Sequence, residues 1–124
     1  MVVVAMADTL ELREQSIDGV SVVEVIGELD VYHAFRLKEL IQKSIANGTR
    51  GLVLDLTSTQ YIDSSGVGTL IFANSICKKA QMPFRLSNPH GPVLRVIELT
   101  KLIGYLPIAG SSQEAIDQII QPGA

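Results

Sequence analysis

Residues 51–70 have the sequence GLVLDLTSTQYIDSSGVGTL, and the order of apolar and polar residues in this stretch decides the fold. The apolar run 52–56 is too short for a typical helix and lies between Gly51 and the polar residues 57–59, which is typical of a buried strand. A pattern of helical period follows. Between the two, Asp63 is a good N-cap residue. The stretch therefore predicts a strand, a turn and a helix, in that order.

Two serines, Ser64 and Ser65, follow Asp63 at the first helical positions. Backbone N–H groups have no partner inside the helix there, so we expect an exposed hydroxyl, and the helix dipole would favour a negative charge on it. Two interpretations are open from the residues alone. In one, Asp63 and the serines cap the helix and Gly66 permits close packing. In the other, Ser65 is a switch residue whose modification changes what the protein binds.

The flanking sequence alternates between strand and helix patterns. From the N-terminus we expect strands over 9–15 and 20–26, joined by a turn at Asp18-Gly19, and then a helix that is capped by Asp30 and runs to about Gly48. The strand over 51–57 and a helix over 64–80 follow. The rest of the chain is expected to form a strand over 83–86, a helix over 93–101, a strand over 105–108 and a last helix after the capping box Ser111–Glu114. This order predicts an α/β fold with a mostly parallel central sheet, an antiparallel N-terminal strand and about four helices.

The length of 124 residues and the hydrophobic content of 47% are those of a single domain. We assign residues 1–8 to an N-terminal extension and residues 9–121 to the domain. The apolar residues 2–4 extend an edge strand, pair two chains or fray, so we expect a monomer or a weak dimer. No uninterrupted apolar run reaches the roughly 20 residues that span a membrane. The single cysteine, Cys77, is expected on a buried helix face and fits a reducing cytoplasm.

The charge of the chain bears on its partners. A net charge of −3 argues against nucleic acid, since phosphate binding needs a clustered basic surface. Residues 1–30 carry seven acidic residues and one basic residue, Arg13. Such an acidic surface could steer a basic protein partner, although a solvated strand face is the commoner meaning of the pattern.

Catalytic, metal and cofactor chemistry have little support. Asp55 resembles the phosphoacceptor of a response regulator, but the accompanying acidic pair and lysine are missing, so we expect a strand-end hydrogen-bonding role. His33 and His90 lie on separate elements without the spacing of metal ligands. No base accompanies the serines, the Gly-x-Ser-x-Gly elbow is absent, and residues 66–68 lack the lysine of a P-loop. We therefore expect no enzyme, metal or cofactor.

Three ordered blocks of sequence resemble the STAS domains of the anti-sigma factor antagonist family, the bacterial proteins that bind an anti-sigma kinase and so release a sigma factor. The blocks are Asp63–Gly66 with residues 52–56 before it and 67–70 after it, Gly27–Asp30 followed by Ala34 and Leu37, and Asn88-Pro89 followed by Val93, Leu99-Thr100 and Leu102. The likeness covers about Thr9 to Ile120 and implies the STAS fold.

The resemblance implies phosphorylation at Ser65, the second serine of the family motif. It further implies that the unmodified form docks on an anti-sigma factor serine kinase and that the phosphorylated form does not. A phosphatase that removes the phosphate from Ser65 is a further expected partner. We place partner binding on two segments, with the residues Glu28, Asp30, Tyr32, Asp63, Ser64, Ser65 and Gly66. Acidic charge there suits a basic kinase face, while capping by Asp30 and simple solvation of Glu28 remain open.

The resemblance also leaves a second class of function open. STAS domains occur as accessory subunits of lipid-transport complexes and in stress-signalling assemblies, where the serine need not be phosphorylated. The intact Asp63–Gly66 motif favours the phosphorylation switch. Co-purification distinguishes the two, since the switch requires a histidine-kinase-like ATPase partner and the accessory subunit a transporter ATPase.

Overall fold

A computed structural model describes residues 1–6, 9–102 and 104–122. Its elements are β1 (Val2–Met6), β2 (Leu10–Ile17), β3 (Val20–Leu29), α1 (Ala34–Ala46), β4 (Gly51–Asp55), β5 (Thr59–Ile62), α2 (Ser64–Lys79), β6 (Phe84–Ser87), α3 (Gly91–Leu99), β7 (Ile108–Ala109) and α4 (Ser112–Ile120). The boundary predicted between residues 8 and 9 adjoins residues 7 and 8, which lie outside the described residues.

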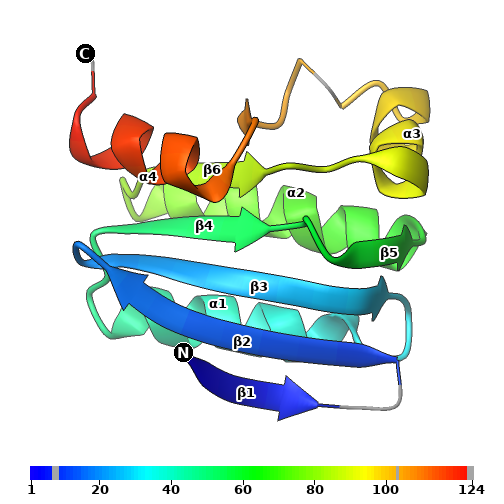
Figure 1. Cartoon of the computed structure of the whole chain (residues 1–124), viewed down its shortest axis with the longest axis horizontal. Coiled ribbons are helices and arrows are strands. Elements are labelled where there is room, and N and C mark those ends of the chain that lie inside the picture. The colour runs from blue at the N-terminus through cyan, green and yellow to red at the C-terminus, as the bar shows by residue number, and fades with distance from the viewer. Residues whose placement is uncertain (7–8, 103, 123–124) are drawn as a thin grey trace.

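The strands form one sheet in the order β1-β2-β3-β4-β6-β7, and β5 pairs with β3 off this path (Figure 1). The β1–β2 and β2–β3 pairs are antiparallel, and every other described pair is parallel. Helices α1 and α2 lie on one face of the sheet and α4 lies on the other. The prediction of an α/β fold with four helices and an antiparallel N-terminal strand is confirmed.

The sheet separates two hydrophobic cores. Side chains of a strand point alternately to opposite faces. Accordingly β3 contributes Val23 and Val25 to the larger core, under α1, α2 and α3, and Val20 and Val22 to the smaller core under α4. All four side chains are at most 5% exposed, so β3 is buried on both faces over its first half.

Part of the acidic charge of the N-terminal quarter has partners inside the fold. The carboxylate of Glu14 accepts hydrogen bonds from the hydroxyls of Ser21 (2.8 Å) and Ser44 (2.7 Å). Glu11 forms an ion pair with Arg13 on the same strand. These two acidic residues therefore have structural roles, and they are poor candidates for steering a basic partner.

Strand β5 was not predicted. The turn before α2 was expected to follow the strand over 51–57, but it follows β5 instead. The strand predicted over 51–57 ends at Asp55, because the Asp55 carboxylate accepts hydrogen bonds from the backbone N–H (3.0 Å) and the hydroxyl (2.6 Å) of Thr57. This confirms the strand-end role expected for Asp55. The chain then pairs residues 59–62 with the end of β3, so Asp63 follows β5 rather than the preceding strand.

The predicted cap of the first helix was wrong. Helix α1 begins at Ala34, and its N-cap position is His33, which makes no capping hydrogen bond through its side chain. Asp30 instead accepts hydrogen bonds from the backbone N–H groups of Tyr32 (3.0 Å) and His33 (3.1 Å). Asp30 therefore closes a turn that precedes the helix, as its short side chain allows.

The last predicted strand is also shorter and later than expected. The backbone N–H groups of Tyr105 and Leu106 both donate to the carbonyl of Leu102 (2.9 Å each), which holds this segment in a helical-type turn. On this edge of the sheet, the described pairing with β6 begins at Ile108 and ends at Ala109. No helix in the described ranges is long and apolar enough to cross a membrane.

Cys77 lies on the buried face of α2, as predicted. Burial raises the pKa of its thiol from 9.0 to about 11, because the thiolate would lose its hydration. The thiol therefore favours the folded state below pH 9, and this contribution is lost as the pH rises from 9 to 11.

At pH 8 we expect a disulfide reagent to modify Cys77 in the native protein roughly 100-fold more slowly than in the urea-unfolded chain. Equal rates would contradict the burial.

Candidate functional site

Asp63 caps helix α2 from an extended backbone conformation. Its Oδ1 atom accepts hydrogen bonds from the backbone N–H groups of Ser65 (2.9 Å) and Gly66 (3.0 Å). These are two of the N–H groups that have no partner within the helix, and the carboxylate charge suits the positive end of the helix dipole. The predicted N-cap is confirmed.

The second carboxylate oxygen of Asp63 joins α2 to the loop between β3 and α1. Its Oδ2 atom accepts a hydrogen bond from the backbone N–H of Val31 (3.0 Å), and the backbone N–H of Asp63 donates to the carbonyl of Leu29 (3.4 Å). The structure thus brings together the two segments, 27–33 and 63–66, on which the sequence places partner binding. Both lie at the carboxyl end of the parallel strands, where α/β sheets usually carry their sites (Figure 1).

Gly66 lies inside the protein rather than on its surface. A Cβ atom at this position would be 2.3 Å from the carbonyl oxygen of Leu29 and 2.5 Å from Cγ1 of Ile62. The glycine therefore lets the first turn of α2 pack directly against the end of β3. The close packing predicted for Gly66 is confirmed. This packing fixes the position of the helix turn on which the two serines lie.

The two serines differ in environment. Ser64 is exposed, whereas Ser65 is half-buried. The hydrogen bonds of Ser65 to described residues use its backbone, with the N–H donating to Asp63 and the carbonyl accepting from the hydroxyl of Thr69 (3.0 Å). The hydroxyl of Ser65 is consequently not committed within the described part of the chain, and a change at that oxygen leaves the cap intact.

The predicted contact residues in segment 27–33 differ in exposure. Tyr32 is 76% exposed, but Glu28 is half-buried in β3 and the side chain of Asp30 is only 15% exposed. The Asp30 carboxylate also lies 3.0 Å from Nδ1 of His33. Asp30 therefore acts mainly by holding the turn that presents Tyr32, because its Oδ1 atom accepts hydrogen bonds from the backbone of its own loop.

Three exposed apolar side chains at this end of the molecule were not predicted from the sequence. Val31, Phe35 and Tyr61 are 59%, 52% and 48% exposed. Val31 adjoins Tyr32 in the loop that Asp63 anchors, and Phe35 lies in the first turn of α1, off its buried face. The sequence held one indication of this exposure, because Phe35 lies outside the helical spacing of Leu37 and Ile41, which face the core. Exposed apolar side chains that cluster are typical of interaction surfaces.

The carboxylates of Asp63 and Asp30 are committed to backbone hydrogen bonds. The Asp63 carboxylate beside the serines has both oxygens engaged by backbone N–H groups, so it is poorly placed to accept a proton from a serine hydroxyl. Within the described ranges, no cluster of three or more histidine, cysteine or acidic side chains is placed to hold a metal ion.

Comparisons with known proteins agree with this architecture. An anti-sigma-B factor antagonist of Listeria monocytogenes is 29% identical over 102 residues, covering 81% of this chain and 87% of the relative. The crystal structure of an anti-sigma factor antagonist from Mycobacterium paratuberculosis matches with a TM-score of 0.83 and 26% identity, covering 94% of this chain and 99% of the other. The phosphorylated form of the Bacillus cell fate determinant SpoIIAA shares the fold, with a TM-score of 0.67 and 22% identity over 87% and 98% of the two chains.

The model of the STAS domain matches residues 11–115. This range contains the Asp63 cap, both serines and the turn held by Asp30. It confirms the STAS fold expected from the three sequence blocks. Because the match covers most of the 124 residues, the chain belongs to the STAS domain family.

Proposed function

We propose that this protein is an anti-sigma factor antagonist that binds an anti-sigma factor kinase and is switched off by phosphorylation of Ser65. The observation that carries the proposal is the uncommitted hydroxyl of Ser65 at the start of α2, beside a loop of exposed apolar residues that Asp63 holds in place. The Listeria and Mycobacterium relatives, both named anti-sigma factor antagonists, support the assignment.

The partner surface in this proposal, here termed the switch face, consists of Val31, Tyr32, Phe35, Ser64 and Ser65. Its aromatic side chains, Tyr32 and Phe35, are 76% and 52% exposed. Large aromatic side chains contribute most to binding when a partner buries them. Glu28 lies at the end of β3, just before the loop, and supplies acidic charge at the border that would steer a basic kinase surface.

Phosphorylation of Ser65 would oppose docking without unfolding the domain. A phosphate adds roughly −1.5 to −2 charges, and the N-terminus of α2 tolerates this charge in water. Under a docked partner the same group must lose its hydration beside exposed apolar side chains and close to the Asp63 carboxylate. A protein of this fold, SpoIIAA, has been solved in a phosphorylated form, which supports such a state for the fold.

The test is the affinity of Ser65 variants for an anti-sigma kinase from the same organism, measured by titration calorimetry. We expect Ser65→Asp to weaken binding at least tenfold, about 1.4 kcal/mol, and Ser65→Ala to bind like the wild type while resisting phosphorylation. Ser64→Asp is the matched control, since its exposed side chain lies one position away, and it should weaken binding less. The unfolding temperatures of all three should stay close to that of the wild type.

Mapping the phosphate after incubation with the kinase and ATP tests the same proposal independently. We expect modification at Ser65 alone. Phosphate on Ser64, or a Ser65→Asp variant that binds as tightly as the wild type, would refute the switch.

A further inference from the structure

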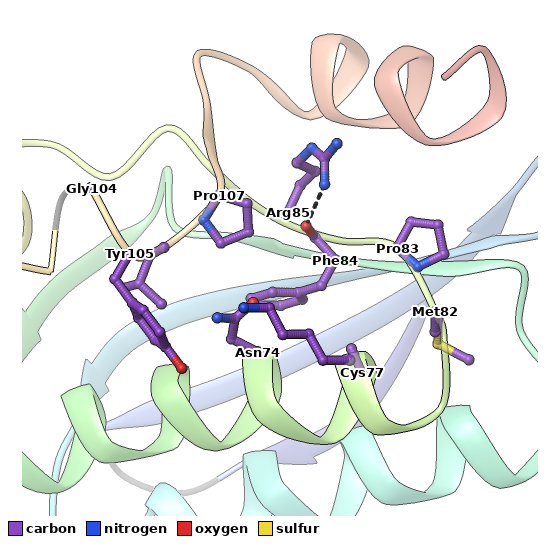
Figure 2. Close-up of a pocket in the computed structure, with 11 residues that line it drawn as sticks. Asn74, Cys77, Met82, Pro83, Phe84, Arg85, Gly104, Tyr105 and Pro107 are labelled. Carbon is purple, nitrogen blue, oxygen red and sulfur yellow. Dashed lines mark hydrogen bonds between the residues drawn. The ribbon is translucent and has the colours of Figure 1, made fainter. Parts of the chain in front are cut away.

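A pocket of about 410 Å³ lies between the second half of α2 and the free edge of β6 (Figure 2). Its walls include Phe84 on β6, Tyr105 and Pro107 in the segment before β7, and Cys77 on α2. Ser65 lies in the first turn of the same helix, so the pocket is separate from the switch face.

The pocket exists because β7 covers only part of the β6 edge. Pairing with β7 is confined to Leu86 and Ser87, which leaves the edge at Phe84 without a neighbouring strand. The carbonyl of Phe84 accepts a hydrogen bond from Nη1 of Arg85 (2.8 Å), shown as the dashed line in Figure 2, and Nε of Arg85 bonds to Gln118 of α4 (2.9 Å). The guanidinium of Arg85, which also lines the pocket, is thus held by Gln118 and by the Phe84 carbonyl.

Two polar side chains of α2, those of Asn74 and Lys78, line this pocket. Asn74 is only 3% exposed, and its Nδ2 atom makes no hydrogen bond to any described residue. In Figure 2 its side chain rises from α2 toward the rings of Phe84 and Tyr105. The ammonium group of Lys78 lies 5.3 Å from the centroid of the Tyr105 ring. None of the described residues that line the pocket has a carboxylate.

This combination is unusual for a structural crevice. A buried amide without a partner is destabilising, and nearly all such groups in folded proteins are hydrogen-bonded. Here the unpaired amide and the Lys78 ammonium share a pocket whose other walls include aromatic rings, prolines and sulfur-containing side chains as well as Arg85. Apolar walls with a few convergent polar groups are the general features of sites for small molecules, and the volume lies within their usual range.

We propose that the pocket binds a small organic carboxylate with a planar apolar body. The carboxylate would accept hydrogen bonds from Nδ2 of Asn74 and from the ammonium of Lys78, while the planar body lies against Phe84 and Tyr105. A carboxylate accepts hydrogen bonds from both donors and also pairs its charge with the ammonium, whereas a neutral amide can accept but does not offset that charge and an ammonium cannot accept. The pocket is open to solvent on one side, so affinity on the order of 1 mM or somewhat tighter is expected for a minimal ligand.

The first test is a titration of the isotope-labelled protein with phenylacetate, followed through the side-chain amide signals of Asn74 in proton–nitrogen correlation spectra. We expect a saturable shift with phenylacetate, at least tenfold weaker binding of phenylacetamide, and none of phenethylammonium. Lys78→Gln should weaken phenylacetate binding several-fold. Lys79→Gln is the control, because Lys79 is exposed and does not line the pocket. The absence of saturation, or equal binding of acid and amide, would overturn the proposal.

Asn74→Leu separates a ligand-binding role from a structural one. Leucine is of similar size and removes the unpaired amide, so a residue kept for its ligand should give a variant that unfolds at the same or a higher temperature and no longer binds phenylacetate. A lower unfolding temperature would show that Asn74 serves the fold and would count against the site. Both measurements use the protein alone, so they do not depend on the proposed switch.

Discussion

Gly66→Ala should lower the free energy of unfolding by about 3 kcal/mol, as expected for severe overpacking. The added Cβ would lie 2.3 Å from the Leu29 carbonyl oxygen, which belongs to a buried strand end and has little room to move. It would also lie 2.5 Å from Cγ1 of Ile62. The first turn of α2 must therefore shift away from β3 and β5. Urea unfolding followed by circular dichroism measures the loss.

Gly68→Ala, two residues further along the same helix, is the matched control. No heavy atom lies within 4 Å of a Cβ built at Gly68. Alanine favours a helix over glycine by up to about 1 kcal/mol, so this variant should be more stable than the wild type. Changes of the same sign and size at the two positions would show that Gly66 is not closely packed.

Asp63→Ala should destabilise the protein by about 2–3 kcal/mol, because it removes one helix cap and one bond to a second segment. Asp63→Asn should lower stability by only about 1 kcal/mol. An asparagine keeps one oxygen for the backbone of Ser65 and Gly66, but its amide nitrogen cannot accept the bond from Val31. The two variants therefore separate the stability contributed by the helix cap from that contributed by the hydrogen bond to Val31.

Amide hydrogen exchange distinguishes the two contributions residue by residue. The Val31 N–H should exchange faster in both variants of Asp63. The N–H groups of Ser65 and Gly66 should exchange faster in Asp63→Ala and stay close to the wild type in Asp63→Asn. If Asp63→Asn leaves exchange at Val31 unchanged, the hydrogen bond from that N–H to Oδ2 does not hold the loop.

Elements whose pattern is local were predictable from the sequence. The hairpin of β2 and β3, helix α2 and its Asp63 cap follow from alternation, helical spacing and the preference of aspartate for the N-cap. The resemblance carried by three sequence blocks led to the STAS fold. Ser65 as a phosphorylation site also came from the resemblance, since the residues alone left the cap and the switch open.

The features that escaped prediction depend on distant parts of the chain. Strand β5 has no alternating pattern of its own and exists because residues 27–29 offer it a parallel edge. Asp30 can cap a helix or close a turn with the same oxygen, and the loop that Asp63 anchors selects the turn. The exposure of Phe35, and the lack of a partner for Nδ2 of Asn74 among the described residues, follow from which elements pack beside them. Helical spacing does not specify this packing.

The hydrogen bond between Asp63 and Val31 joins residues 32 positions apart in the chain. Closing a loop of that length has an entropic penalty that local structure cannot offset, so contacts of this kind form only when strands from distant segments have paired. If β5 has not paired with β3, helix α2 and the loop after β3 are not held side by side. In the proposed function, recognition by a partner would then report that folding is complete, and newly made or damaged chains would not engage it.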